Sequence, residues 1–162
     1  MKRYFLSLLV CLTCALSAQA QEKLIPMGTD IPIVAEQQIN AYELTEGQII
    51  ELRTASDVKL STGEIAIPKG SLVNARVRTG LHQRVLANQK RRLIIDVQEV
   101  VLANGDKIAL SNGVASFTTG KSSGGLKATR LRYVSPSKYL IPTDYVIHAK
   151  VDVSHTINLT QE

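Results

Sequence analysis

A short phrase that joins a proline turn to alternating apolar and polar residues occurs three times in this chain, at Ile25–Ile33, Ile67–Val77 and Ile141–Val151. Proline presets a backbone φ of about −65° for a turn, and a Gly or Asp two residues later tolerates the left-handed conformation that most side chains avoid. Each phrase therefore predicts a turn that begins a β-strand. The residues that carry these turns are Pro26, Gly28, Pro68, Gly70, Pro142 and Asp144.

Much of the remaining chain shows the same two-residue alternation, together with the β-branched content and the flanking turn residues that are typical of strands. The predicted strands are Ile31–Ala35, Gln48–Thr54, Val58–Leu60, Glu64–Ile67, Ser71–Thr79, Arg91–Ala103, Lys107–Leu110 and Tyr145–Ile157. The last has the clearest pattern, with one apolar face formed by Tyr145, Ile147, Ala149, Val151 and Val153.

Two turns between these strands indicate antiparallel hairpins, one at Ser61-Thr62-Gly63 and one at Ala103-Asn104-Gly105-Asp106. The apolar residues of Arg91–Ala103 shift by one position around Gln98 and Glu99, which predicts a β-bulge of the kind that bends strands in small barrels. We therefore expect an all-β fold, a small antiparallel β-barrel or closed sandwich, in a single domain covering residues 21–162.

The stretch from Gly113 to Leu140 differs from the rest because Gly, Ser, Thr and Lys dominate it. Gly124-Gly125 and Ser135-Pro136 interrupt any regular element there. It is predicted to be one long, flexible polar connection, and a loop of this length in a compact domain is either functional or disordered.

Residues 1–20 have the organisation of a secretory signal peptide. Lys2 and Arg3 precede an apolar run, and Ala18-Gln19-Ala20 offers small residues for cleavage after Ala20. The apolar run is shorter than the roughly 20 residues that cross a bilayer, so no transmembrane span is expected. The sequence predicts a protein exported to the periplasm or cell surface of a bacterium.

Both cysteines, Cys11 and Cys14, lie inside the signal peptide, so the mature chain forms no disulfide. Acylation of one of them is an alternative, although Val10 and Thr13 match poorly the small residue that lipoprotein signals place before the cysteine. A cysteine-free exported domain is more typical of a bacterial envelope than of small animal secreted proteins.

Charge is distributed unevenly, with eight acids and four bases in residues 21–75 but six acids and thirteen bases in residues 76–162. Two stretches hold bases without acids: Arg76, Arg78, Arg84, Lys90, Arg91 and Arg92 in the first, and Lys121, Lys127, Arg130, Arg132 and Lys138 in the second. They form either a solvated sheet face and loop or a surface for an anionic glycan or lipid head group. Nucleic acid is a weaker possibility because only Tyr133 and Tyr139 accompany the bases as stacking aromatics.

No group of residues indicates a cofactor, a metal ion or catalysis. The histidines His82, His148 and His155 have no metal-ligand spacing, and the serines lack the Gly-x-Ser-x-Gly setting. Gly120-Lys121-Ser122 lacks the upstream glycine of a phosphate-binding loop. We therefore expect a protein that is not an enzyme and binds no cofactor or metal.

The order of turns and strands resembles the C-terminal β-barrel domain of the TrbI/VirB10 family of type IV secretion and conjugation proteins. The matching segments, between Ile25 and Leu110, are Pro26-Met27-Gly28-Thr29, Asp57-Val58, Ile67-Pro68-Lys69-Gly70-Ser71, Arg92-Leu93-Ile94-Ile95 and Asn104-Gly105-Asp106-Lys107-Ile108. The resemblance implies a barrel and a place in a cell-envelope assembly. Where that family inserts a helical hairpin into the outer membrane, this chain has the polar residues 113–140.

Two functions fit these features. The first is a structural or interaction module of the cell envelope, whose partner is an envelope protein or a second copy of the chain. The second is a periplasmic or surface module that binds an anionic glycan or lipid head group through the base-rich stretches.

Overall fold

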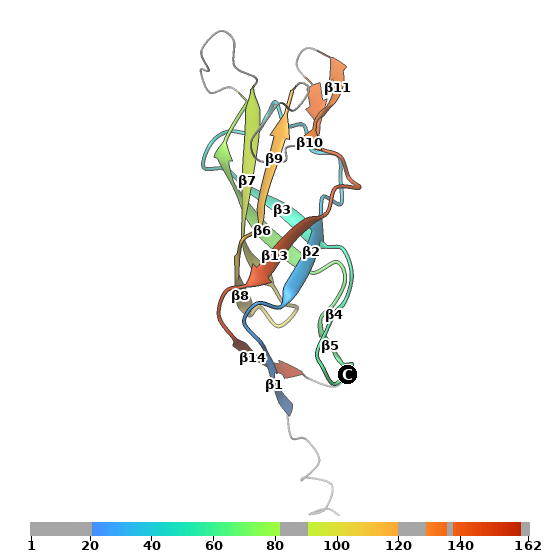
Figure 1. The fold of residues 1–162 in the computed structure, drawn as a ribbon, viewed down its shortest axis with the longest axis vertical. Helices are drawn as coiled ribbons and strands as arrows, with labels where there is room; N and C mark the ends of the chain where they lie inside the picture. Colours follow the sequence, from blue (N-terminus) through green and yellow to red (C-terminus); the bar gives the residue numbers. More distant parts are fainter. Residues whose placement is uncertain (1–20, 82–90, 120–128, 136–137, 160–162) are drawn as a thin grey trace, which may run out of the picture.

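The computed structural model describes residues 21–81, 91–119, 129–135 and 138–159, and these contain strands and turns but no helix. Their centre is a closed antiparallel barrel, in which the strands follow the order β7-β6-β3-β2-β13-β8 and β8 pairs back to β7. The predicted all-β barrel is therefore confirmed. Figure 1 shows an elongated molecule with additional strands above and below the barrel.

The barrel wall is continuous because each of its strands is hydrogen-bonded to two neighbours. Its strands are β2 (Asp30–Val34), β3 (Ile49–Thr54), β6 (Leu72–Thr79), β7 (Arg92–Val101), β8 (Lys107–Ser111) and β13 (Ile147–Val151). The first five of these were predicted, with ends that differ by a few residues, and β13 is the first part of the strand predicted over Tyr145–Ile157.

Four further pieces extend from the barrel. At the upper end in Figure 1, β9 (Val114–Thr118) continues along β7, and β10 (Thr129–Arg130) pairs with β9. The hairpin of β11 (Arg132–Ser135) and β12 (Lys138–Leu140) also belongs to this end. At the lower end lie β1 (Gln21–Ile25) paired with β14 (His155–Leu159), and β4 (Val58–Lys59) paired with β5 (Ile65–Ile67).

The core is aliphatic and fills the barrel. Alternate residues of each strand point inward, and the side chains that are at most 1% exposed include Ile31, Ile33, Val73, Val77, Leu93, Ile95 and Ile108. Burial of this apolar surface drives folding, at about 25 cal/mol per Å². Small barrels of this kind have interiors just wide enough for side chains, so binding groups must lie on the outside.

The predicted turns adopt the expected conformation at two of the three phrases. Gly28 has a φ of 83° and Gly70 a φ of 82°, both in the left-handed region. Asp144 does not adopt a positive φ. Among the described non-glycine residues, only Asn112 does. The third phrase therefore turns at Thr143–Asp144, as predicted, with ordinary backbone angles.

The bulge is confirmed at the predicted place. In the ladder between β6 and β7, Asn74 pairs with Glu99 and Ala75 pairs with Val97, which leaves Gln98 as the extra residue. The two predicted hairpins are also present, with Gly63 and Gly105 at positive φ in their turns.

The single strand predicted over Tyr145–Ile157 is wrong, because the chain bends at Asp152 and Val153 between β13 and β14. The amide of Asp152 donates to the carbonyl of Ala109, and the hydroxyl of Ser154 accepts a hydrogen bond from the amide of Met27. These contacts direct β14 away from the barrel and toward β1. As a result, Val153 is 66% exposed rather than buried.

The connection predicted over residues 113–140 is also wrong for the part that the structure describes. Val114–Thr118 forms β9, in which Ala115, Phe117 and Thr118 are buried, and three short strands follow between Thr129 and Leu140. Residues 120–128 and 136–137 lie outside the described residues.

Candidate binding surfaces

The two base-rich stretches meet at the upper end of the sheet. Arg92 of β7 pairs in register with Thr118 of β9, which pairs in turn with Arg130 of β10. Neighbouring strands lie about 4.8 Å apart, so the Cα atoms of Arg92 and Arg130 are separated by about 10 Å. One cation from each stretch therefore borders the buried Thr118.

The other predicted bases are distributed as follows. Arg76 and Arg78 lie on β6, the strand next to β7, and Arg91 is exposed just before β7. Arg132 and Lys138 are exposed on the β11–β12 hairpin. Arg84, Lys90, Lys121 and Lys127 lie outside the described residues.

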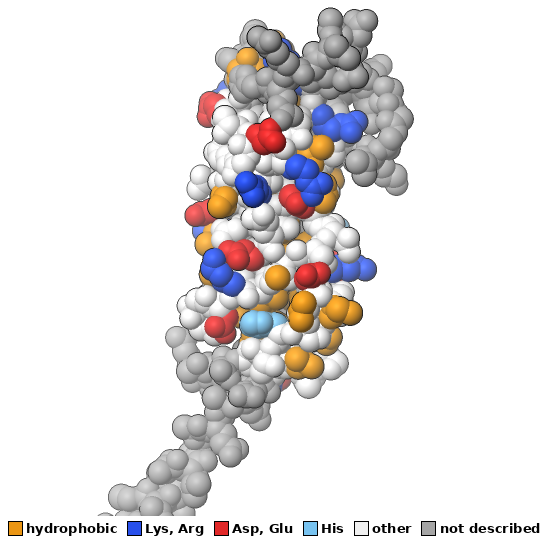
Figure 2. Space-filling model, turned by 90° about the vertical axis from the view of Figure 1, so that its left-hand side faces the viewer, with side chains coloured by type: hydrophobic (Ala, Val, Ile, Leu, Met, Phe, Trp, Pro, Cys, Tyr) orange, Lys and Arg blue, Asp and Glu red, His pale blue; other side chains and the backbone are white. Residues whose placement is uncertain are grey.

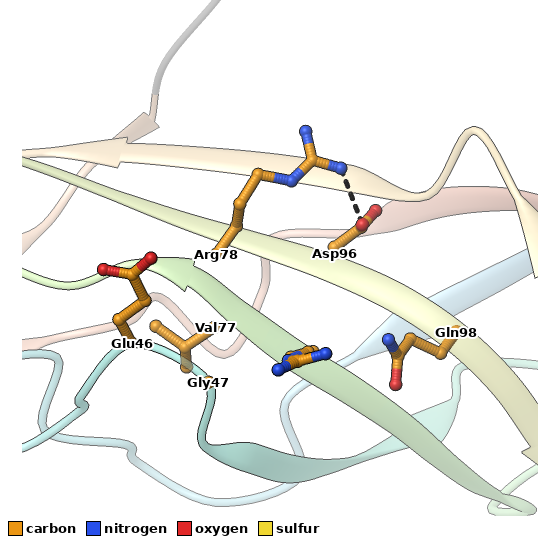
Figure 3. A pocket seen from close by; sticks show the side chains of 7 residues that line it. Glu46, Gly47, Val77, Arg78, Asp96 and Gln98 are labelled. Atoms are coloured by element: carbon orange, nitrogen blue, oxygen red, sulfur yellow. Dashed lines mark hydrogen bonds and ion pairs between the residues drawn. The ribbon is translucent and has the colours of Figure 1, made fainter.

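A shallow depression of about 260 Å³ lies over β6 and β7 (Figure 3). Arg78 donates from Nη2 to Oδ2 of Asp96 at 2.6 Å, so an acid already neutralises this cation. Arg76 lines the same depression, and its Nη2 would lie 3.7 Å from a Cβ placed on Gly47. It makes no hydrogen bond or ion pair with any described residue, so its guanidinium is available to a carboxylate or phosphate.

A second charged group on the barrel wall is internally satisfied. Oε1 of Glu99 accepts hydrogen bonds from Nζ of Lys107 at 2.7 Å and from Nδ2 of Asn74 at 2.8 Å. These hydrogen bonds, that from Lys107 above all, hold the pKa of Glu99 below its usual range. This group stabilises the β6-β7-β8 sheet and offers no free charge to a ligand.

His148 lies next to one acidic residue. Nδ1 of His148 lies 2.8 Å from Oδ2 of Asp30, across the β13–β2 ladder. Within the described residues, no three His, Cys, Asp or Glu side chains come together as metal ligands. The absence of a metal or cofactor in the functional protein stays a prediction.

Exposed aromatic side chains form one small group. The rings of Tyr133 and Tyr139 are 5.3 Å apart and tilted by 57° across the β11–β12 hairpin. Tyr139 packs against the core, whereas Tyr133 is 57% exposed. The two predicted stacking residues are therefore brought together, with one ring accessible.

The sequence did not reveal the apolar surface at the lower end of the molecule. Leu24, Met27 and Val153 are 56%, 68% and 66% exposed. The hydrogen bond from the amide of Met27 to Ser154 brings the Met27 backbone close to the residue after Val153, and Leu24 lies three residues earlier, on β1. We call these three residues the lower apolar patch. In Figure 2, apolar side chains gather toward the lower part of the face, whereas acidic and basic ones are interspersed above.

No protein-family model matches this sequence, and no curated protein is significantly similar to it. Within the described residues, there is no helix long and apolar enough to cross a membrane.

Proposed function

We propose that this protein is an exported, non-enzymatic module of the bacterial cell envelope that acts by binding another envelope protein. The observation that carries the proposal is the lower apolar patch, in which three large apolar side chains are each more than half exposed on the surface of a rigid barrel. Isolated exposed apolar residues are ordinary, but neighbouring ones favour a protein interface.

The sequence of the N-terminus supports export. Cleavage after Ala20 would make Gln21 the first residue of the mature chain. The predicted cut would therefore leave all five residues of β1 to pair with β14. The resemblance to the TrbI/VirB10 barrel supports a secretion-type or conjugation-type assembly as the setting.

Site-specific photo-crosslinking in the native bacterium tests this function. We expect a crosslinking amino acid at Met27 to capture an envelope protein, or a second copy of the chain. A probe at Val114, an apolar residue that is 43% exposed at the start of β9, is the matched control. A Met27 probe that captures nothing, or that captures the same products as the Val114 probe, would count against the proposal. Retention of Met1 in the extracytoplasmic protein would disprove cleavage.

The alternative function is binding of an anionic glycan or lipid head group, and the convergence of Arg92 and Arg130 favours it. Vesicles with anionic lipid and acidic polysaccharides should then bind at low salt and dissociate as salt rises. Replacing both Arg92 and Arg130 with Gln should weaken binding more than the same change at the exposed Lys59 of β4 and the exposed Lys69 after β5. Equal effects of the two pairs would indicate a nonspecific response to net charge.

A further inference from the structure

Strand β3 is paired along its whole length on one edge but only at its end on the other. Toward β6, the register runs continuously from Ile49–Arg76 to Arg53–Leu72. Toward β2, only two pairs form, Arg53 with Val34 and Thr54 with Ile33. The first half of β3 therefore has a second edge that no described strand covers.

Hydrogen bonds at both ends of β3 show which of its residues face this open edge. The carbonyl of Gln48 accepts from the amide of Val77, and the amide of Thr54 donates to Ser71. Because backbone groups alternate along a strand, even-numbered residues bond to β6 and odd-numbered residues face the opposite way. Ile49 and Glu51 thus direct their N–H and C=O groups to the open edge, where no described residue pairs with them.

The chain that would have continued β2 leaves this edge instead of covering it. Beyond Ala35, the carbonyl of Ile39 accepts from the amide of Ile141, and the amide of Ala41 donates to the carbonyl of Tyr139. These bonds attach residues 39–41 to β12 rather than to β3.

A depression of about 430 Å³ occupies the space that results, and its size lies within the usual range for binding pockets. It runs along the open edge and is lined on one side by β3 and on the other by the segment after β2. Its lining includes Glu36, Ile39, Ile49, Glu51 and Arg53.

The side chains around the depression indicate what it would accept. Ile49 is 63% exposed, and with Ile39 it offers an apolar contact. Nε of Arg53 donates to Oε2 of Glu36 at 3.1 Å, so these two charges neutralise each other. Glu51 is exposed and has no ionic partner among the described residues. The depression therefore favours an apolar side chain next to a basic one.

We propose that an extended segment of a partner protein, with an apolar and a basic residue two positions apart, adds to the open edge of β3 at Ile49 and Glu51. Its backbone would satisfy the two free N–H and two free C=O groups, its apolar side chain would contact Ile49, and its Lys or Arg would pair with Glu51. Strand addition of this kind obtains affinity from main-chain hydrogen bonds and specificity from alternate side chains. The inference rests on the proposed interaction function and gives it a second, chemically defined site.

The test uses the chain from Gln21 onward and, as the probe, the blocked peptide acetyl-Thr-Val-Thr-Lys-Thr-Val-Thr-Lys-Thr-amide, in which Val and Lys alternate along one face. In the free protein, the amides of Ile49 and Glu51 should exchange with solvent much faster than those of Ile50 and Leu52, and adding peptide should slow only the first pair. Two peptide analogues, one N-methylated at every Thr and the other at every Val and Lys, separate the two peptide edges. One analogue should lose binding by about tenfold or more, because only one edge faces β3.

Two substitutions at Glu51 separate the contribution of its backbone N–H to peptide binding from that of its charge. Glu51→Pro removes an N–H that the barrel does not use, so the protein should stay folded while peptide binding falls about tenfold or more. Glu51→Gln keeps the N–H and should weaken binding by a smaller factor that disappears at high salt. The amide spectrum of each variant reports whether the barrel is intact, and if Glu51→Pro unfolds it, the N-methylated peptides decide alone.

Equal binding of both N-methylated analogues, unchanged binding to a folded Glu51→Pro variant, or no response of Ile49 and Glu51 to millimolar peptide would each overturn the proposal. A free protein that is dimeric through β3, and becomes monomeric with Glu51→Pro, would replace the partner segment with a second copy. The crosslinking test at Met27 is independent of β3, so a failure of the envelope function and a failure of this site can be told apart.

Discussion

Gly113 lies where β8 leaves β13 and the chain continues as β9, and there is no room for a side chain at this position. A Cβ on this residue would lie 2.7 Å from Cβ of Ala149 and 2.8 Å from Cβ of Val97. Its carbonyl also accepts the amide of Val97 at 2.8 Å, so the backbone has little freedom to retreat. The glycine permits close packing of three strands where the barrel closes.

Replacing Gly113 with Ala should therefore lower the free energy of unfolding by about 1–3 kcal/mol, the usual cost of overpacking. Urea denaturation of the variant measures this loss. Adding Ala149→Gly removes the nearest atom, so the double variant should be more stable than the sum of the two single changes predicts. If the effects of the two changes on the free energy of unfolding were additive, the strands would move apart at no energetic cost.

Glu99 should make stability depend on pH in a defined direction. Its folded pKa is lowered by hydrogen bonds from Lys107 and Asn74, so its contribution is fully present above the unfolded value of about 4.3 and is lost as pH falls through the folded value. We expect Glu99→Gln to cost at most about 1 kcal/mol at pH 7, since Lys107 is largely exposed, and to cost less at about pH 3, below the unfolded value.

Denaturation of wild type and Glu99→Gln at both pH values gives that difference. Asp152→Asn, an exposed carboxylate at the β13–β14 bend, serves as the comparison. A Glu99→Gln cost that is equal at the two pH values would assign the effect to packing rather than to ionisation.

At the level of secondary-structure elements, the sequence predicted those features that depend on a few neighbouring residues. The hairpin at Asn104-Gly105, the positive φ of Gly70 and the bulge at Gln98 each depend on a few adjacent residues. The break at Asp152 depends instead on Ala109 and Met27, which are distant in sequence. β9 was missed because Ser116 and Thr118 are polar but buried, so the strand has no alternation to detect.

β9 is part of the fold's core and not a surface connection, and Phe117 provides the test. This side chain is fully buried and meets the Tyr145 ring edge-on, with centroids 5.3 Å apart. Phe117→Ala should lower the free energy of unfolding by about 3–5 kcal/mol. Val114→Ala, an exposed change on the same strand, should cost less than about 0.5 kcal/mol. Thermal denaturation that shows similar effects for both would place β9 outside the core.

At the scale of the whole molecule, the candidate sites depend on register between distant strands, and the sequence does not encode that register locally. The base-rich stretches were visible as composition, but the meeting of Arg92 and Arg130 required the β7-β9-β10 order. The open edge of β3 appears only because residues 39–41 pair with residues 139–141. Charge can be read from a chain directly, whereas an unpaired edge is a property of the complete topology.

The two ends of the chain close the lower end of the molecule together. β1 pairs with β14 over five residues, Ile25 and Ile157 are at most 1% exposed in the core, and Lys23 forms an ion pair with Glu64 in the β4–β5 hairpin. A chain that begins at Pro26 loses all three features. Because removing one buried Ile costs about 2–5 kcal/mol, its thermal midpoint should fall by roughly 10 °C or more.

A chain that begins at Lys23 is the matched control, since it keeps Ile25 and the ion pair and should melt within a few degrees of the chain from Gln21. Differential scanning calorimetry of the three chains measures both effects. If the chain from Pro26 melted together with the other two, β1 would be an appendage of the barrel, and the position of the signal cleavage would carry no structural consequence.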